Sequence, residues 1–130
     1  MEPHIDGRHV RYLGPVHAVH RAATLARAHA LLHLIDFDEP FGYSVVEAMA
    51  SGTPVIANAR GSMSELIDHG TTGYLVNTTD EAVEAVDLAR HVDREAIRAT
   101  AVARFDVDAM IRRYVAVYRS ILDDLHPHRG

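Results

Sequence analysis

Short apolar runs punctuated by Gly, Pro and Asp recur through the first part of the chain. Runs of about four to eight residues that are closed by such breakers are typical of buried strands. The runs that fit this pattern are His9–Leu13, Leu31–Ile35, Thr53–Ala57 and Gly73–Val76. The sequence therefore predicts about four short strands.

Helix patterns separate these runs. Val16–Leu32 is rich in Ala and Leu, and Tyr43–Ala50 is followed by a Gly and a Pro that stop a helix. Ser62–Glu65 has the S-x-x-E pattern of a capping box, which predicts a helix of one or two turns that ends before Gly70.

Beyond the last strand only helix patterns remain, at Asp80–Ala89, Arg94–Ala103 and Val107–Leu122. The last of these has apolar residues at i, i+3, i+4 and i+7, namely Val107, Met110, Ile111, Tyr114, Tyr118, Ile121 and Leu122. This stripe predicts one face buried against a core, with its tyrosines as core residues and not as a stacking platform. The tail His126–Gly130 is expected to fray.

Strands that alternate with helices at short intervals indicate right-handed βαβ crossovers. We therefore expect an α/β fold, with a partial Rossmann-like parallel sheet of about four strands, flanking helices and an α-helical C-terminal end. The length of 130 residues and the lack of a Pro/Gly/Ser-rich linker predict one domain over residues 1–130. Parallel sheets of this kind bind ligands at the carboxyl ends of their strands.

Composition narrows the functions. The absence of Cys excludes disulfides, thiolate metal sites and a Cys nucleophile, and it fits a cytoplasmic location. A net charge of −5 with no basic stripe argues against nucleic acid as a partner. Residues 1–16 lack a signal sequence, and no run is long enough for a transmembrane segment. All thirteen basic residues are Arg, so an anion must be held by Arg or by backbone N–H groups.

The chemistry is concentrated after the second apolar run. There the chain carries Glu39 and Gly42 and then enters the helix of Tyr43–Ala50. A helix N-terminus at the carboxyl end of a parallel strand offers free N–H groups, which makes it an anion site. Glu39 in the loop and Glu47 in the early helix can flank one ligand. A carboxylate accepts hydrogen bonds from both hydroxyls of a sugar or ribose diol.

Glu39–Ala57 reads E-P-F-G-Y-S-V-V-E-A-M-A-S-G-T-P-V-I-A, which strongly resembles the E-x7-E donor motif of glycosyltransferase family 4. This is a large retaining family with the GT-B fold. The similarity extends to Leu13–Val16, Gly61–Ile67 and His69–Val76, and it covers about residues 9–120.

The resemblance implies roles for individual residues. Glu39 would contact hydroxyls of the donor sugar, as the catalytic carboxylate, and Glu47 would bind the nucleotide ribose. Val16 and Arg21 would border the base, and Glu65 would be mainly structural. The backbone amides that would face the donor sugar and its diphosphate are those of Phe41, Gly42, Tyr43 and Ser44. The donor would be a nucleoside diphosphate sugar, with no cofactor and no metal.

Other interpretations of these residues stay open. Ser44–Glu47 also fits a capping box, in which Glu47 would bond to the N-terminus of its own helix. Glu39 could be a solvated loop acid, and Gly42 a helix-entry glycine. Asp36-Phe37-Asp38 has the D-x-D pattern that other glycosyltransferase folds use for a metal, but family 4 does not depend on a metal held in this way. The spacing of His17 and His20 falls short of a zinc signature.

The resemblance also defines what this sequence lacks. A family member has an acceptor-binding domain before this region, and its donor domain opens with strands that carry Arg and Lys for the diphosphate. We therefore expect no sugar transfer by the chain alone, and activity only with the missing half. The alternatives are a non-catalytic sugar-nucleotide sensor, or an oligomerisation module, such as a dimer, that buries the unpaired N-terminal edge of the sheet against a copy of itself.

Overall fold

The computed structural model describes residues 4–125 and has an α/β fold. Its strands are β1 (Leu31–His33), β2 (Val55–Asn58) and β3 (Gly73–Val76). Its helices are α1 (Ala18–Arg27), α2 (Tyr43–Ala50), α3 (Met63–Leu66), α4 (Thr79–Leu88), the 3-10 turn η2 (Ala89–His91), α5 (Arg94–Phe105) and α6 (Val107–Leu125). The strands form one parallel sheet in the order β1-β2-β3, so the predicted fold class is confirmed.

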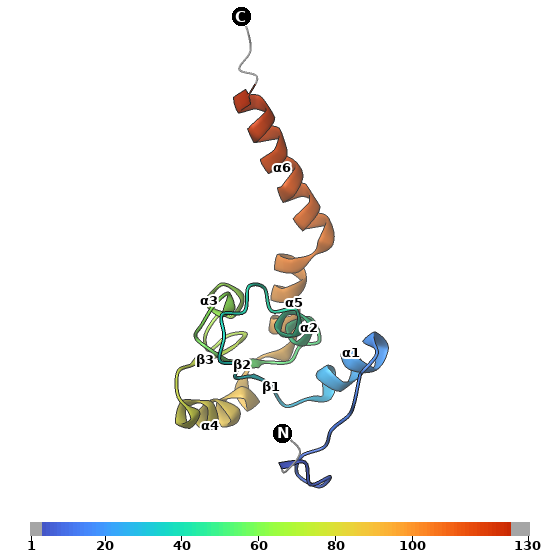
Figure 1. Cartoon of the computed structure of the whole chain (residues 1–130), viewed down its shortest axis with the longest axis vertical. Helices are drawn as coiled ribbons and strands as arrows, with labels where there is room; N and C mark the ends of the chain where they lie inside the picture. The colour runs from blue at the N-terminus through green and yellow to red at the C-terminus, as the bar shows by residue number, and fades with distance from the viewer. Residues whose placement is uncertain (1–3, 126–130) are drawn as a thin grey trace, which may run out of the picture.

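Alternation along β2 divides the core between the two faces of the sheet. Val55 and Ala57 pack with residues of α2, α3 and α5, whereas Ile56 packs with residues of α4 and with Val76. Figure 1 shows α2, α3 and α5 on one side of the sheet and α4 on the other. The side chains of Val55, Ile56 and Ala57 are fully buried, as expected for the central strand of a parallel sheet.

Arg94, the first residue of α5, fixes the end of α1. Its guanidinium donates to the carbonyls of Ala28 (2.9 Å) and Ala26 (2.8 Å) and to the hydroxyl oxygen of Thr53 (3.0 Å). The last carbonyls of a helix have no partner inside the helix, and here a cation supplies one. This contact joins segments that are far apart in the sequence and places α1 beside α2.

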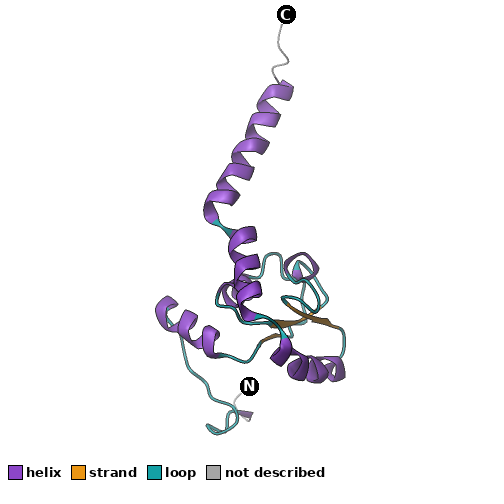
Figure 2. Cartoon of the chain, turned by 180° about the vertical axis from the view of Figure 1, so that it is seen from behind, coloured by secondary structure: helices purple, strands orange, loops and turns teal. Residues whose placement is uncertain are grey.

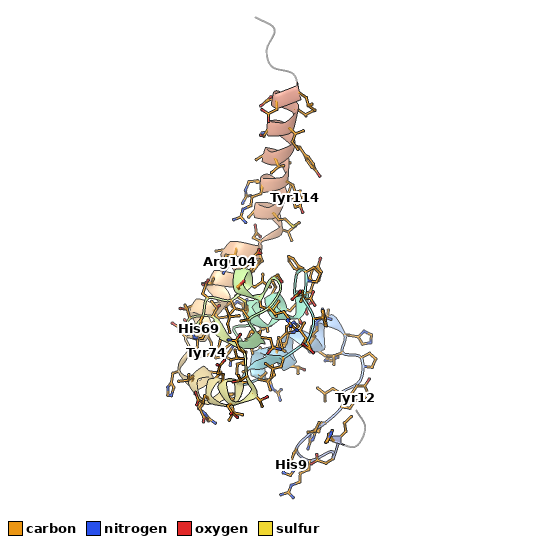
Figure 3. The ribbon with its side chains drawn as sticks, turned by 60° about the vertical axis from the view of Figure 1, so that its left-hand side comes forward. His9, Tyr12, His69, Tyr74, Arg104 and Tyr114 are labelled. Carbon is orange, nitrogen blue, oxygen red and sulfur yellow. The ribbon has the colours of Figure 1, made fainter. Side chains whose placement is uncertain are left out.

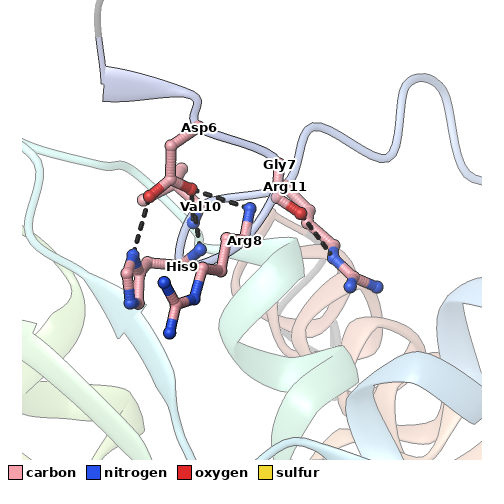
Figure 4. Close-up of polar contacts among 6 residues, drawn as sticks. All are labelled: Asp6, Gly7, Arg8, His9, Val10 and Arg11. Carbon is pink, nitrogen blue, oxygen red and sulfur yellow. Dashed lines mark hydrogen bonds and ion pairs between the residues drawn. The ribbon is translucent and has the colours of Figure 1, made fainter.

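The strand predicted at His9–Leu13 is wrong, because this segment has irregular structure. One carboxylate oxygen of Asp6 accepts from the amides of Arg8 (2.9 Å), His9 (2.7 Å) and Val10 (2.8 Å), as Figure 4 shows. These three amides therefore donate within a local turn, whereas in a strand they would be available to pair with a neighbouring strand. The Val10 amide and then the His9 ring lower the pKa of Asp6 from 3.8 to about 2.

The predicted burial of the last helix is also wrong. The helix forms, but α6 has no buried residue, and Tyr114 and Tyr118 are 58% and 61% exposed. Figures 1 and 2 show α6 extending away from the sheet, and Figure 3 shows Tyr114 above the body of the molecule. The stripe correctly indicated an amphipathic helix, but periodicity does not reveal whether the covering surface belongs to the same chain.

None of the helices within residues 4–125 combines the length and hydropathy needed for a membrane span. The predicted fraying of His126–Gly130 lies outside the described residues.

Candidate donor-binding site

The loop between β1 and α2 lies at the carboxyl end of β1 and leads directly into a helix N-terminus. Gly42 is the N-cap of α2, has a left-handed backbone with φ +85°, and is buried. Its carbonyl accepts from the amides of Val45 (3.0 Å) and Val46 (3.2 Å), which starts the helix. Within residues 4–125, the amides of Tyr43 and Ser44 donate to no acceptor. Two N–H groups at the tip of α2 are thus available to a ligand.

The carboxylate of Glu39 folds back onto this same turn. Its Oε1 atom accepts from the amide of Gly42 (3.2 Å) and, with a longer distance, from that of Phe41 (3.4 Å). The side chain is therefore oriented by the loop that carries it, residues 36–42 between β1 and α2, which we call the motif loop. All four amides were expected to face the donor. Those of Phe41 and Gly42 donate to Glu39, whereas those of Tyr43 and Ser44 have no acceptor among the described residues.

A second loop, residues 60–62 after β2, presses against the motif loop. The Ser62 amide donates to the carbonyl of Glu39 (3.0 Å), and the Ser62 hydroxyl donates to the carbonyls of Glu39 (2.9 Å) and Phe41 (3.2 Å). A Cβ at Gly61 would lie 2.7 Å from the Glu39 carbonyl oxygen. The loop that carries Glu39 is therefore fixed by close backbone contacts with residues 61–62.

These contacts also correct the capping box predicted at Ser62–Glu65. The short helix α3 begins after Ser62, but the Ser62 side chain makes no capping hydrogen bond. Its hydroxyl is used by the carbonyls of the motif loop, a tertiary contact that the S-x-x-E spacing cannot reveal.

Glu47 lies in the second turn of α2 and faces α1. Its Oε1 atom is 2.5 Å from Nη2 of Arg21, and the two side chains are 40% and 45% exposed. Ser44 lies inside the helix and the N-cap is Gly42, so the alternative capping box at Ser44–Glu47 does not form. Glu47 and Arg21 line a groove of about 540 Å³ between α1 and α2, together with Ser51, Arg98 and small side chains of both helices.

The structure thus joins some of the predicted site residues and separates others. Glu47 and Arg21 are in contact, and Val16 is half-buried just before α1. Glu39 shares a turn with Phe41 and Gly42 but is not among the residues that line the Glu47 groove. The two motif carboxylates therefore lie at different places: Glu39 in the loop before the N-terminus of α2, and Glu47 in the second turn of the helix.

Arg60 is a residue of this region that the sequence reasoning missed. Its Nη1 atom forms an ion pair with Asp36, and its Nε atom lies 3.6 Å from the carboxylate of Asp38. The two acids of the D-x-D pattern are thus partners of a guanidinium. Within residues 4–125, no group of three or more His, Asp or Glu residues is arranged to hold a metal ion. Arg60 could have been singled out in the sequence, because it follows the end of the predicted third strand and precedes Gly61.

Comparison with known proteins identifies the family. The family model described as Glycosyl transferases group 1 matches residues 5–101. The chain belongs to this family. The matched region contains the β1–α2 loop, Glu39 and Glu47, and the loop of residues 60–62 that contacts the backbone of Glu39.

Two individual proteins resemble this chain over most of its length. N-acetyl-alpha-D-glucosaminyl L-malate synthase of Bacillus anthracis is 33% identical over 93% of this chain and 33% of its own length. Phosphatidyl-myo-inositol mannosyltransferase of Mycobacterium leprae is 31% identical over 87% of this chain and 32% of its own length. The chain therefore spans about a third of the length of these relatives.

Two solved structures also match most of this chain but only about a third of their own length. The glycosyltransferase AviGT4, involved in avilamycin A biosynthesis, matches 89% of this chain and 37% of its own chain with 30% identity and a TM-score of 0.74. Anabaena HepE in complex with UDP-glucose matches 87% of this chain and 33% of its own chain, with 25% identity and a TM-score of 0.67.

Proposed function

We propose that this chain is the donor-binding half of a retaining family 4 glycosyltransferase, which moves a sugar from a nucleoside diphosphate to an acceptor hydroxyl. The observation that carries the proposal is the E-P-F-G-Y-S loop in a group 1 glycosyl transferase. This loop enters α2 with two amides, those of Tyr43 and Ser44, that have no acceptor within residues 4–125. A relative of similar fold, HepE, was solved with UDP-glucose, which makes a UDP-sugar the first donor to test.

The contacts of Glu39 and of the α2 N-terminus support different roles for the carboxylate and the backbone amides. One oxygen of Glu39 is held by the Gly42 amide, so the other oxygen is left to orient a donor hydroxyl. The amides of Tyr43 and Ser44 lie at the positive end of α2. There they would stabilise charge that develops on the leaving diphosphate, while an acceptor hydroxyl attacks from the same face.

Glu47 needs a partner exchange before it binds ribose. Its ion pair with Arg21 is about half exposed, and such pairs contribute about 0–1 kcal/mol. A ribose diol can therefore replace the guanidinium at small cost. Arg21 then remains in the groove between α1 and α2, where we place the base.

The proposal includes what this chain leaves to others. An acceptor-binding domain or subunit would close the cleft over the motif loop, and without it we expect donor binding but no transfer. We expect no cofactor and no metal, no nucleic acid partner, and a cytoplasmic location for the completed enzyme.

Calorimetric titration with UDP-glucose tests the assignment of both carboxylates. Loss of one charge-assisted hydrogen bond costs about 1.5–3 kcal/mol, so Glu39→Gln and Glu47→Gln should each weaken binding about 10- to 100-fold. Glu84→Gln, on the exposed face of α4, is the matched control and should bind like the wild type. If the wild type binds none of the UDP, GDP, ADP and dTDP sugars, the proposed function is wrong. Unchanged affinity in both motif variants would instead remove these carboxylates from the site.

The exposed edge of the sheet favours a second candidate, an oligomerisation module. In the described part of the chain β1 pairs only with β2, and Leu32 and Leu34 are 56% and 43% exposed beside the free edge. A homo-oligomer, such as a dimer, would cover them. Light scattering at high protein concentration tests this candidate, which a monomeric mass would exclude. A non-catalytic sensor would bind donor yet show no transfer after an acceptor domain is supplied.

A further inference from the structure

A polar pocket of about 240 Å³ lies where all three strands end. Its walls come from Asp36 after β1, from Asn58 and Arg60 at the end of β2, and from Asn77 after β3. This is the edge at which parallel sheets bind ligands. The pocket combines amide, guanidinium and carboxylate groups, so it suits a highly polar guest.

Arg60 is the positive charge of this pocket, and it is tied to the motif loop from two sides. Its side-chain partner Asp38 directly precedes Glu39, and its chain neighbour Gly61 touches the backbone of Glu39. Among residues 4–125, Arg60 is the one arginine with a hydrogen bond or ion pair to the loop of residues 36–42. Arg21, by comparison, pairs with Glu47 on the other side of α2.

The ion pairs of Arg60 are built for exchange. Asp36 is fully exposed and Asp38 is 81% exposed, whereas the Arg60 side chain is 43% exposed. Ion pairs this exposed add little to stability, because water solvates both partners well. A guanidinium can bind one phosphate through two parallel N–H bonds, whereas Asp36 and Asp38 each contact a single nitrogen of Arg60.

We propose that Arg60 binds the diphosphate of the donor, and that Asp36 and Asp38 hold its guanidinium while the site is empty. The inference rests on the proposed function, since it requires a nucleoside diphosphate at the tip of α2. The inference also explains how a chain without Lys can place a cation beside the leaving group. The cation is Arg60, in the loop after β2, and the amides of Tyr43 and Ser44 make the other phosphate contacts.

Titration of the full chain with uridine, UMP and UDP, and with GDP in parallel, tests the proposal. Arg60→Gln should weaken UDP binding about 10-fold and leave uridine binding unchanged, because uridine has no phosphate. Asp36→Asn removes a competitor for the guanidinium and should tighten UDP binding about 2- to 5-fold. Arg90→Gln is the matched control. Arg90, in η2, forms an exposed pair with Asp87 of α4, and the variant should bind UDP like the wild type.

The outcomes separate this inference from the function on which it rests. If the wild type binds neither UDP nor GDP, the proposed function fails and the role of Arg60 falls with it. If the wild type binds UDP and Arg60→Gln binds it equally well, only the role of Arg60 is overturned. An equal loss of uridine and UDP affinity in Arg60→Gln would also overturn it, because the effect would then not depend on the phosphates.

Discussion

Replacing Gly61 by Ala tests whether the loop after β2 fixes the position of Glu39. Gly61 has a φ of +56°, and a Cβ there would lie 2.7 Å from the carbonyl oxygen and 2.8 Å from the amide nitrogen of Glu39. A left-handed backbone costs a non-glycine residue about 1–2 kcal/mol. Because the close atoms belong to backbone, they cannot turn away as a flexible side chain would, and overpacking adds about 1–3 kcal/mol.

Gly70 provides the matched control. It has a φ of +80°, but a Cβ there would meet nothing within 4 Å, so Gly70→Ala carries the backbone cost alone. Urea unfolding followed by circular dichroism should therefore show Gly61→Ala to be less stable than Gly70→Ala by about 1–3 kcal/mol. With a slope of about 1–3 kcal/mol per molar urea, the unfolding midpoints should differ by about 1 M. Gly61→Ala should also weaken donor binding, because relief of the contact displaces Glu39.

Equal unfolding free energies for the two alanine variants would refute this reasoning, because the backbone contact would then carry no energetic weight. A destabilised Gly61→Ala protein with unchanged donor affinity would separate the two claims. It would keep the contact as part of the fold and remove it from the positioning of Glu39.

Two further predictions concern the places where the structure departs from the sequence pattern. The pKa of Asp6 is lowered from 3.8 to about 2, so the turn that it organises is fully stabilised above pH 4 and loses that stabilisation as the pH falls through 2. NMR shifts of the amides that it accepts from should follow this step, and Asp6→Asn should abolish it. Ile97→Ala, at a fully buried site, should cost about 2–5 kcal/mol, whereas Ile111→Ala, at a half-exposed site of α6, should cost less than about 0.5 kcal/mol. Similar losses in urea unfolding for both would show that α6 is packed against a core after all.

The local elements could be predicted well from the sequence. The helix Tyr43–Ala50 and the strand Gly73–Val76 were predicted with the bounds that the structure shows. Helix formers bounded by breakers, and apolar runs closed by polar residues, carry their own start and stop signals. The motif order also indicated a glycosyltransferase, and the comparisons show the group 1 glycosyl transferase family. The motif could be found in the sequence because its residues are contiguous in the chain.

The partners of polar side chains could not be predicted in this way. Ser62 has the spacing of a helix cap, yet its hydroxyl serves the carbonyls of the motif loop, because that loop approaches it in space. The sequence places Arg60 just after β2, but only the parallel sheet brings it beside Asp36 and Asp38.

The sequence alone determined most of the helices and the three strands, and it located the E-x7-E motif, since both depend on neighbours along the chain. Only the tertiary structure decided that Glu39 rests on the amides of its own loop, that Glu47 faces α1, and that the apolar stripe of α6 stands exposed. The physical reason is that a hydrogen bond or a buried face needs a second surface, and the chain order does not state where that surface lies.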